Sequence, residues 1–215
     1  MISASTLSAQ LQLYLVLDPD LVTGDPLEAA RAAMRGGVTM LQLRAKHCTD
    51  REILALAEPL VDTCRQAGVP FLVNDRLDLA LACGADGVHL GVDDLPLARA
   101  RQLGGSTLII GYSPESDEQI RAAAENGASY LGIGPVFATS TKGDAGEPLG
   151  VAEFARRHQL SGLPAVGIGG ISVQNAGKVM EAGADGVAVV SAILAHPHPR
   201  QATAELLRVI QRSRS

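Results

Sequence analysis

The chain has 215 residues, of which 47% are hydrophobic and 19% are charged, and its formal net charge is −5. This balance supplies enough apolar residues for a sizeable core, and it excludes a disordered chain and a basic surface for nucleic acid. No apolar run is long enough to cross a bilayer, and the three cysteines are scattered without metal-type or redox-type spacing, so we expect a cytoplasmic protein without a membrane partner.

The first predicted strand follows a short leader. Residues 1–10 lack the basic start and the apolar stretch of a signal peptide, and we expect them to form a leader or a partial cap on the floor of the domain. Residues 13–17 then form a continuous apolar run, which is typical of a buried strand. We assign residues 11–215 to a single domain.

Glycine-led strand starts recur along the rest of the chain. The sequence Gly-Ala-Asp-Gly-Val occurs at residues 84–88 and again at residues 183–187, and looser copies occur at residues 36–41 and 127–132. In each copy a helix-like segment ends in glycine, which adopts the left-handed conformation that other residues resist. An apolar strand follows shortly afterwards.

A second class of strand start alternates with the first. It combines Gly with Pro or Ser, and it precedes the apolar strands at residues 71–73, 108–110 and 165–168. A proline at the first position of a strand removes no interior hydrogen bond of the sheet. Together with residues 13–17, the two classes give eight short strands.

Helix-like segments lie between these strands, with apolar residues at intervals of three and four, as at residues 53–61 and 120–124. Strands that alternate with helices indicate a parallel α/β sheet, and eight such units in about 200 residues indicate a closed (β/α)8 TIM barrel. The two strand classes occupy even and odd positions, which suits a barrel whose interior layers come from alternate strands. An open doubly wound sheet is the alternative, and closure is favoured because the eight strands show no obvious split.

Polar side chains share one face at the end of the second strand. Gln42, Arg44 and Lys46 alternate with apolar residues, so they lie on the same side of an extended chain. The helix-facing side of a barrel strand is apolar, and the polar face therefore points into the mouth of the barrel. Two cations and an amide suit a phosphate or pyrophosphate there. An edge strand with a solvated face is the alternative.

Carboxylates follow the third and fourth strands. Asp75 and Asp94 stand just past adjacent strands, and together they suit Mg²⁺, which takes few protein ligands beside phosphate oxygens. Helix N-capping is the alternative, and we prefer it for Asp78 and Asp93. His89 alternates with apolar residues, so we expect a hydrogen-bonded histidine in the barrel interior rather than a ligand.

The longest non-periodic segment covers residues 134–148, after the sixth strand. It is rich in hydroxyl groups and glycine, and it carries one lysine, Lys142. Long loops at this end of a barrel often act as lids or anion-binding loops. We expect residues 135–141 to pack, because they include adjacent bulky apolar side chains. Residues 143–147 are too small and polar to pack well, and we expect the whole loop to act as a lid.

Glycine and serine mark the ends of the last two strands. Gly169-Gly170 follows the seventh strand, and Val190-Ser191 follows the eighth. Loops at these positions form the recurrent phosphate site of such barrels, through backbone N–H groups and helix N-termini. The mouth then has one anion site without a cationic side chain and one with arginine, lysine and Mg²⁺. This asymmetry indicates two phosphorylated substrates, a monophosphate and a diphosphate.

Five blocks of the chain resemble the signature blocks of thiamine phosphate synthases. They are residues 42–46, 73–76, 87–94, 134–142 and 166–171. The match runs in order across nearly the whole chain. The resemblance implies a Mg²⁺-assisted transferase that couples an aminopyrimidine diphosphate with a thiazole phosphate, by dissociative substitution, to give thiamine phosphate and pyrophosphate. Small molecules are the partners that it implies, and a homodimer is left open.

The resemblance also implies a role for each site residue. The residues implied to bind the pyrimidine diphosphate are Gln42, Arg44, Lys46, Asn74 and Lys142, together with Ser113, which matches the family's serine near the pyrimidine. Of these, the catalytic contributors are Arg44, Lys46, Ser113 and Lys142. The residues implied to bind the thiazole phosphate are Thr139, Thr141, Gly170, Val190 and Ser191. Asp75 and Asp94 are implied to hold Mg²⁺.

Two other functions remain open. One is a thiazole tautomerase, which shares the barrel and resembles this chain at the glycine pair after the seventh strand and at Ser191. The tautomerases lack the acidic pair after the fourth strand, and they carry a catalytic histidine where this chain has Glu115. Synthases often have that histidine too, so Glu115 departs from both patterns. The other alternative is a non-catalytic phosphate-binding barrel that regulates a partner, which would require neither a diphosphate site nor paired metal carboxylates.

Overall fold

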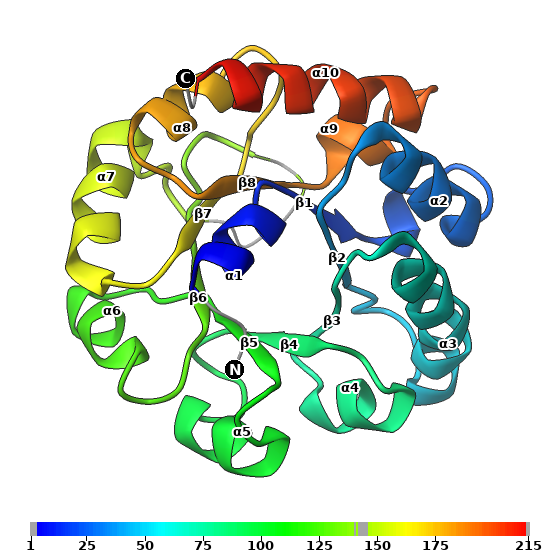
Figure 1. The fold of residues 1–215 in the computed structure, drawn as a ribbon, viewed down its shortest axis with the longest axis horizontal. Coiled ribbons are helices and arrows are strands. Elements are labelled where there is room, and N and C mark those ends of the chain that lie inside the picture. Colours follow the sequence, from blue (N-terminus) through cyan, green and yellow to red (C-terminus); the bar gives the residue numbers. More distant parts are fainter. Residues whose placement is uncertain (1–3, 140, 142–145, 214–215) are drawn as a thin grey trace.

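The computed structural model describes residues 4–139, 141 and 146–213, in which eight parallel strands close into a barrel in the order β1 to β8 (Figure 1). The strands are β1 (Leu13–Leu17), β2 (Met40–Leu43), β3 (Phe71–Asn74), β4 (Gly87–Leu90), β5 (Ile109–Tyr112), β6 (Tyr130–Ile133), β7 (Ala165–Ile168) and β8 (Gly186–Val189). This closed barrel confirms the predicted fold class and excludes the open doubly wound sheet.

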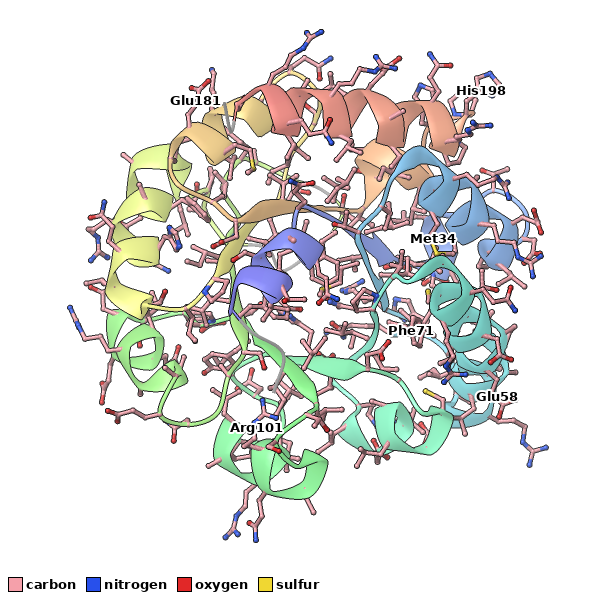
Figure 2. The ribbon with its side chains drawn as sticks, in the orientation of Figure 1. Met34, Glu58, Phe71, Arg101, Glu181 and His198 are labelled. Carbon is pink, nitrogen blue, oxygen red and sulfur yellow. The ribbon has the colours of Figure 1, made fainter. Side chains whose placement is uncertain are left out.

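Most of the helices form an outer ring around the barrel, and polar side chains such as Glu58, Glu181 and His198 lie on its rim (Figure 2). The helices are α1 (Ala4–Gln10), the 3-10 helix η1 (Pro19–Leu21), α2 (Pro26–Gly36), α3 (Asp50–Ala67), α4 (Leu77–Cys83), α5 (Leu97–Gly104), α6 (Asp117–Ala123), α7 (Gly150–Ser161), α8 (Ala176–Glu181), α9 (Ser191–Leu194) and α10 (Pro199–Arg212). Within the described ranges, none of them is both long and apolar enough to cross a membrane.

Local sequence accounts for where the longest helix, α3, begins and ends. The backbone N–H of Thr49 donates to the Glu52 carboxylate at 2.7 Å, and the Thr49 hydroxyl accepts the N–H of Glu52 at 3.4 Å. This reciprocal pair is a capping box. At the other end, Gly68 adopts a left-handed conformation with φ +67° and stops the helix before β3.

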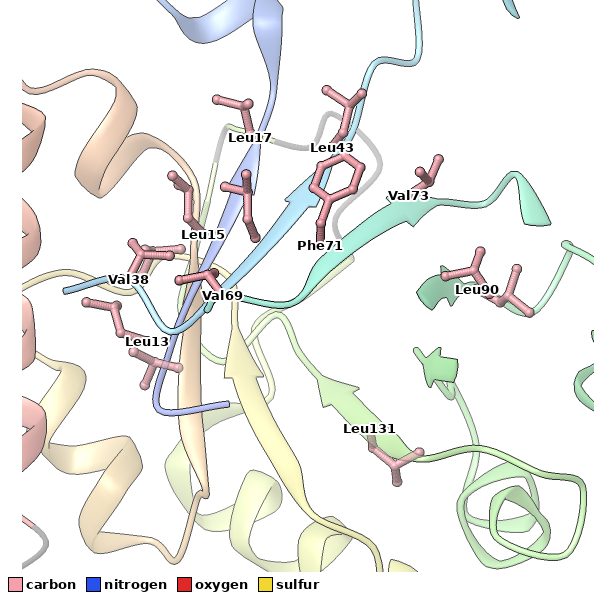
Figure 3. Packing of buried hydrophobic residues seen from close by; sticks show 14 of the residues in the cluster. Leu13, Leu15, Leu17, Val38, Leu43, Val69, Phe71, Val73, Leu90 and Leu131 are labelled. Carbon is pink, nitrogen blue, oxygen red and sulfur yellow. The ribbon is translucent and has the colours of Figure 1, made fainter. Parts of the chain in front are cut away.

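Strand residues alternate between two hydrophobic cores. Leu13, Leu15 and Leu17 of β1 point toward the helices and belong to the larger core (Figure 3). Tyr14, between them, points into the barrel and belongs to the inner core. Leu11, at the end of α1, is fully buried in that inner core, so α1 closes the barrel floor. The domain boundary predicted at residue 10 stays a prediction.

Four polar side chains connect neighbouring strands at the floor of the barrel. Each precedes an even-numbered strand and accepts a hydrogen bond from a backbone N–H near the start of the odd-numbered strand before it. The acceptors are Thr39, Asp86, Ser129 and Asp185, at 2.9, 2.9, 3.1 and 2.9 Å. Asp86 and Asp185 are the aspartates of the two Gly-Ala-Asp-Gly-Val copies, so the repeat in the sequence has a structural reason.

Candidate active site

A cavity of about 1020 Å³ opens at the carboxyl ends of the strands. Every predicted site residue that the structure describes lines it, namely Gln42, Arg44, Lys46, Asn74, Asp75, Asp94, Ser113, Thr139, Thr141, Gly170, Val190 and Ser191. Lys142 and residues 143–145 of the predicted lid lie outside the described residues. In the first half of that loop Val136 is buried, which agrees with the packing expected there.

Arg44 enters the mouth beside Asp18, a carboxylate that follows β1. The Arg44 Nη1 donates to Asp18 Oδ2 at 2.6 Å. Asp18 is only 6% exposed, and its second oxygen accepts the backbone N–H of Asp20 at 3.1 Å. Because β1 and β2 pair directly at Leu17 and Leu43, Asp18 is placed to hold the guanidinium at the edge of the cavity.

Asp75 and Asp94 come together from the ends of β3 and β4. Asp75 Oδ2 lies 3.5 Å from the Lys46 Nζ, and Asp94 Oδ2 accepts the backbone N–H of Gly91 at 2.6 Å. Burial, followed by the neighbouring Asp94 carboxyl group, raises the pKa of Asp75, and Lys46 opposes that rise. Asp75 also has a φ of +61°, and among the described residues it is the one non-glycine residue with positive φ. Strained backbone of this kind often occurs at functional sites.

The donor set of this pair fits Mg²⁺. Two oxygen ligands that repel each other are stabilised by a cation, and Mg²⁺ typically binds through one or two carboxylates together with waters and substrate phosphates. Across residues 4–139, 141 and 146–213, no cluster of three or more His, Cys, Asp or Glu side chains could hold a metal ion. Asp75 and Asp94 therefore suit a metal that a phosphorylated substrate helps to bind.

The N-capping predicted for Asp78 and Asp93 is wrong. Arg76 stands at the N-cap position of α4 without a side-chain cap. Asp78 lies in the first turn of that helix, where its carboxylate accepts hydrogen bonds from the Arg76 guanidinium at 2.7 and 2.9 Å. These bonds lower the pKa of Asp78. The N-cap position of α5 is Pro96, so Asp93 stands too early in the chain and lines the mouth instead.

The turn after β7 is shaped by glycine and by a side chain that supports it. Gly170 has a φ of +64°, and a Cβ built there would lie 2.4 Å from the carbonyl oxygen of Ala138. Only glycine fits such a position without a shift of backbone. Asn175 fixes the turn from the other side, because its amide donates to the Gly170 carbonyl at 2.9 Å and accepts the N–H of Ser172 at 2.8 Å.

The loop after β6 meets the end of β8. The hydroxyl groups of Thr141 and Ser191 lie 3.3 Å apart, and the backbone N–H of Thr141 donates to the Thr139 hydroxyl at 3.2 Å. Ser191 is the first residue of α9, directly after Val190. Hydroxyl groups without an acidic side chain in these contacts form a neutral surface suited to a phosphate.

A chain of hydrogen bonds crosses the barrel interior below the mouth. The Gln42 amide donates to the Tyr14 hydroxyl at 2.5 Å, and the Tyr14 and Tyr130 hydroxyls lie 2.8 Å apart. The Tyr130 hydroxyl is 2.9 Å from Nδ1 of His89, whose Nε2 is 2.8 Å from the Ser113 hydroxyl. His89 is thus a hydrogen-bonded residue of the barrel interior, as expected.

Four further residues line or support this site but were not selected from the sequence, namely Asp18, Tyr14, Arg157 and Asn175. Asp18 could have been found by the signal that selected Asp75, since it also stands directly after a strand. Asn175 and Arg157 carry no comparable signal, because one follows a loop and the other lies on α7 and reaches the mouth from the helix ring. Tyr14 lies in a strand that is buried on both faces, so no alternation of polar and apolar residues marks it.

Comparisons with known proteins agree over nearly the whole chain. A protein-family model described as thiamine monophosphate synthase matches residues 13–193. A thiamine-phosphate synthase of Laribacter hongkongensis is 51% identical over 196 residues, which cover 90% of this chain and 92% of the relative. One of Moorella thermoacetica is 44% identical over 206 residues, covering 95% and 98%. A solved structure of a thiamine phosphate pyrophosphorylase from Pyrococcus furiosus matches with a TM-score of 0.89 and 36% identity, covering 97% of this chain and all of that chain.

Proposed function

The chain belongs to the thiamine monophosphate synthase family, and from this premise we propose that its mouth couples an aminopyrimidine diphosphate with a thiazole phosphate. The enzyme is a transferase, and its products are thiamine phosphate and pyrophosphate. The observation that carries the proposal is the presence of two chemically different anion sites in one cavity. One side has arginine, lysine and paired carboxylates, and the other has glycine and hydroxyl groups.

The diphosphate is assigned to the side formed by β2, β3 and β4. Arg44 and Lys46 would donate hydrogen bonds to its oxygens, and Lys142 is proposed to add a third cation. When bound at Asp75 and Asp94, Mg²⁺ would neutralise the charge that develops on the leaving pyrophosphate. Donors fixed before the bond breaks favour the transition state, because they need no reorganisation as charge accumulates.

The thiazole phosphate is assigned to the opposite side. Gly170 allows its backbone to approach a phosphate closely, and the Thr141 and Ser191 hydroxyls lie 3.3 Å apart beside it. Thr139 and Val190 complete this side. No cationic side chain is required there, since the phosphate of this substrate does not change its charge during the reaction.

The pyrimidine ring would lie between the two anion sites, against Gln42, Asn74 and Ser113. The aminopyrimidine can delocalise the positive charge left on its methylene carbon when the bond to pyrophosphate breaks. The thiazole nitrogen then forms the new carbon–nitrogen bond with its own lone pair, so no proton needs to be removed by the protein. The remaining contribution of the enzyme is to hold the two fragments in contact.

A pyrophosphate-release assay with purified substrates tests this function. We expect pyrophosphate and thiamine phosphate to form in equal amounts, and only when both substrates and Mg²⁺ are present. Conversion of one thiazole tautomer into another without the pyrimidine would assign the chain to the tautomerases instead. Binding of thiazole phosphate without any turnover would favour the regulatory barrel.

A further inference from the structure

The hydrogen-bond chain from Gln42 to Ser113 has a direction. Tyr14 and Tyr130 are both fully buried, and burial raises the pKa of each hydroxyl, so each keeps one hydrogen to donate. Gln42 donates to the Tyr14 hydroxyl, so the arrangement that gives every hydrogen an acceptor has Tyr14 donating to Tyr130. Tyr130, which has accepted that hydrogen bond, can give its own hydrogen to Nδ1 of His89.

The direction continues to the far end of the chain. In the same arrangement Nδ1 of His89 accepts from Tyr130, which places the ring hydrogen on Nε2. Nε2 then donates to the Ser113 oxygen, 2.8 Å away. The hydrogen of the Ser113 hydroxyl is left to point into the mouth. At the other end, Gln42 donates through its nitrogen, so its amide oxygen is left as an acceptor.

Two glycines provide the space for this arrangement. A Cβ built at Gly111 of β5 would lie 2.3 Å from both His89 Nδ1 and the Tyr130 hydroxyl oxygen. A Cβ at Gly132 of β6 would lie 3.1 Å from His89 Cε1 and 3.4 Å from the Ser113 oxygen. The inward-facing positions 111 of β5 and 132 of β6 therefore leave room for the His89 and Tyr130 rings to meet.

We propose that Tyr14 and Tyr130 are positioning residues that select the amino form of the pyrimidine. Through the chain they hold Gln42 as a hydrogen-bond acceptor and Ser113 as a donor at the base of the mouth. An aminopyrimidine offers a donor in its amino group and acceptors in its ring nitrogens, which matches that pattern. The analogue with an oxo group in place of the amino group offers the opposite pattern. This inference rests on the proposed function, because it takes the pyrimidine as the ligand of Gln42 and Ser113.

The chain makes the oxo analogue costly at both ends. To match it, the Gln42 amide would have to turn over, which removes the N–H that Tyr14 accepts, and the Ser113 hydroxyl would have to rotate its hydrogen away from the mouth. A site that hydrogen-bonds its substrate rejects a mismatched analogue strongly, because the buried polar groups are left without partners. Replacing one tyrosine by phenylalanine breaks the chain and lets its two halves reorient independently.

Steady-state kinetics with the aminopyrimidine diphosphate and its oxo analogue test the selection. In Tyr130→Phe and in Tyr14→Phe, we expect the ratio of the two kcat/KM values to fall at least about tenfold, with KM for the thiazole phosphate unchanged. Tyr112→Phe is the matched control, since Tyr112 of β5 packs against the outer core and lies outside the chain. An unchanged ratio in both chain variants, with folding retained, would overturn the proposal.

The ring hydrogen of His89 gives a second measurement that needs no substrate. Long-range ¹H–¹⁵N NMR spectra distinguish the two tautomers, and the His89 signals are identified by their loss in His89→Gln. We expect Nε2–H in the wild type and a mixture of tautomers in Tyr130→Phe. A wild-type hydrogen on Nδ1 would overturn the direction argued above. A wild type that makes no thiamine phosphate would contradict the proposed function, and the tautomer would then still decide the direction of the chain.

Discussion

Among single residues, Asp18 gives the most direct test of the diphosphate side of the mouth, through its ion pair with Arg44. Its carboxylate holds the Arg44 guanidinium at 2.6 Å while nearly buried. Asp18→Asn keeps the side-chain volume but loses the charge, so Arg44 should sample other orientations. We expect kcat/KM for the pyrimidine diphosphate to fall about tenfold, as for the loss of one charge-assisted hydrogen bond. Steady-state kinetics measure it, and Asp20→Asn on the same turn should leave it unchanged.

Asp75 offers a prediction that links stability to metal binding. Its pKa is raised by burial and by Asp94, so the folded state binds its proton more tightly than the unfolded state does. The stability contributed by the protonated group is present at low pH and is lost as pH rises from 3.8 through the raised pKa. At neutral pH, Asp75 therefore destabilises the metal-free protein. Its left-handed backbone, with φ +61°, adds strain that asparagine tolerates well.

We therefore expect Asp75→Asn to raise the Tm of the metal-free protein at pH 7 by about 2–4 °C. The same variant should need at least about tenfold more Mg²⁺ for half-maximal pyrophosphate release, because one carboxylate ligand is lost. Thermal unfolding in a chelator and Mg²⁺ titration of the rate measure the two effects. A lower Tm, or an unchanged Mg²⁺ requirement, would contradict the assignment of Asp75.

Site residues were predictable from sequence where a polar residue directly follows a strand. Asp75 and Arg44 carry that signal, and the fold brings such residues to one edge whatever their neighbours are. The N-cap prediction failed for Asp93 because it assumed a helix start that the chain reaches only after Pro96. Tyr130 could not be assigned, because its partner Tyr14 is 116 residues away and becomes adjacent only when the barrel closes.

At the scale of structural elements, the turn after β7 controls the thiazole phosphate side. Gly170→Ala adds a Cβ that would meet the Ala138 carbonyl oxygen at 2.4 Å, at a φ of +64°. The turn must move away from the loop after β6, and we expect KM for the thiazole phosphate to rise at least about tenfold, since small displacements in such sites have large kinetic effects. KM for the pyrimidine diphosphate should stay near its wild-type value.

Gly68→Ala is the control for that variant. Gly68 has nearly the same φ, +67°, but no atom lies within 4 Å of a Cβ built there, and it ends α3 away from the mouth. Both variants carry the backbone cost of alanine in a left-handed conformation, so the difference between them isolates the steric effect. Equal thiazole phosphate KM values for the two variants would show that the turn does not shape the site.

The strands are the elements that were predicted best from the sequence. All eight predicted strands are present, because each is a short apolar run, and in every strand after the first that run follows a start that contains glycine. The brevity of α8 and α9 was not predicted. Those helices have 6 and 4 residues, and neither has a side-chain hydrogen bond at its N-cap.

At the scale of the whole molecule, the barrel consists of four similar two-strand units. In each unit, a side chain before the second strand accepts a backbone N–H from the first strand. These side chains are Thr39, Asp86, Ser129 and Asp185, of which only two are the same residue type. Closure was predicted from eight strands without an obvious split, and the alternation of strand classes suited a barrel whose interior layers come from alternate strands. What sequence could not predict is which polar residues would meet across the interior.

The seam where the barrel closes has a consequence for synthesis of the chain. Strand β1 pairs with β8, and the hydroxyl of Ser8 donates to Asp185 at 2.6 Å, across 177 positions. During synthesis, α1 and β1 leave the ribosome before β8 and remain without this partner until β8 has emerged. A nascent chain stalled before Gly186 lacks β8 and therefore exposes the unpaired edge of β1, a surface of the kind that chaperones cover.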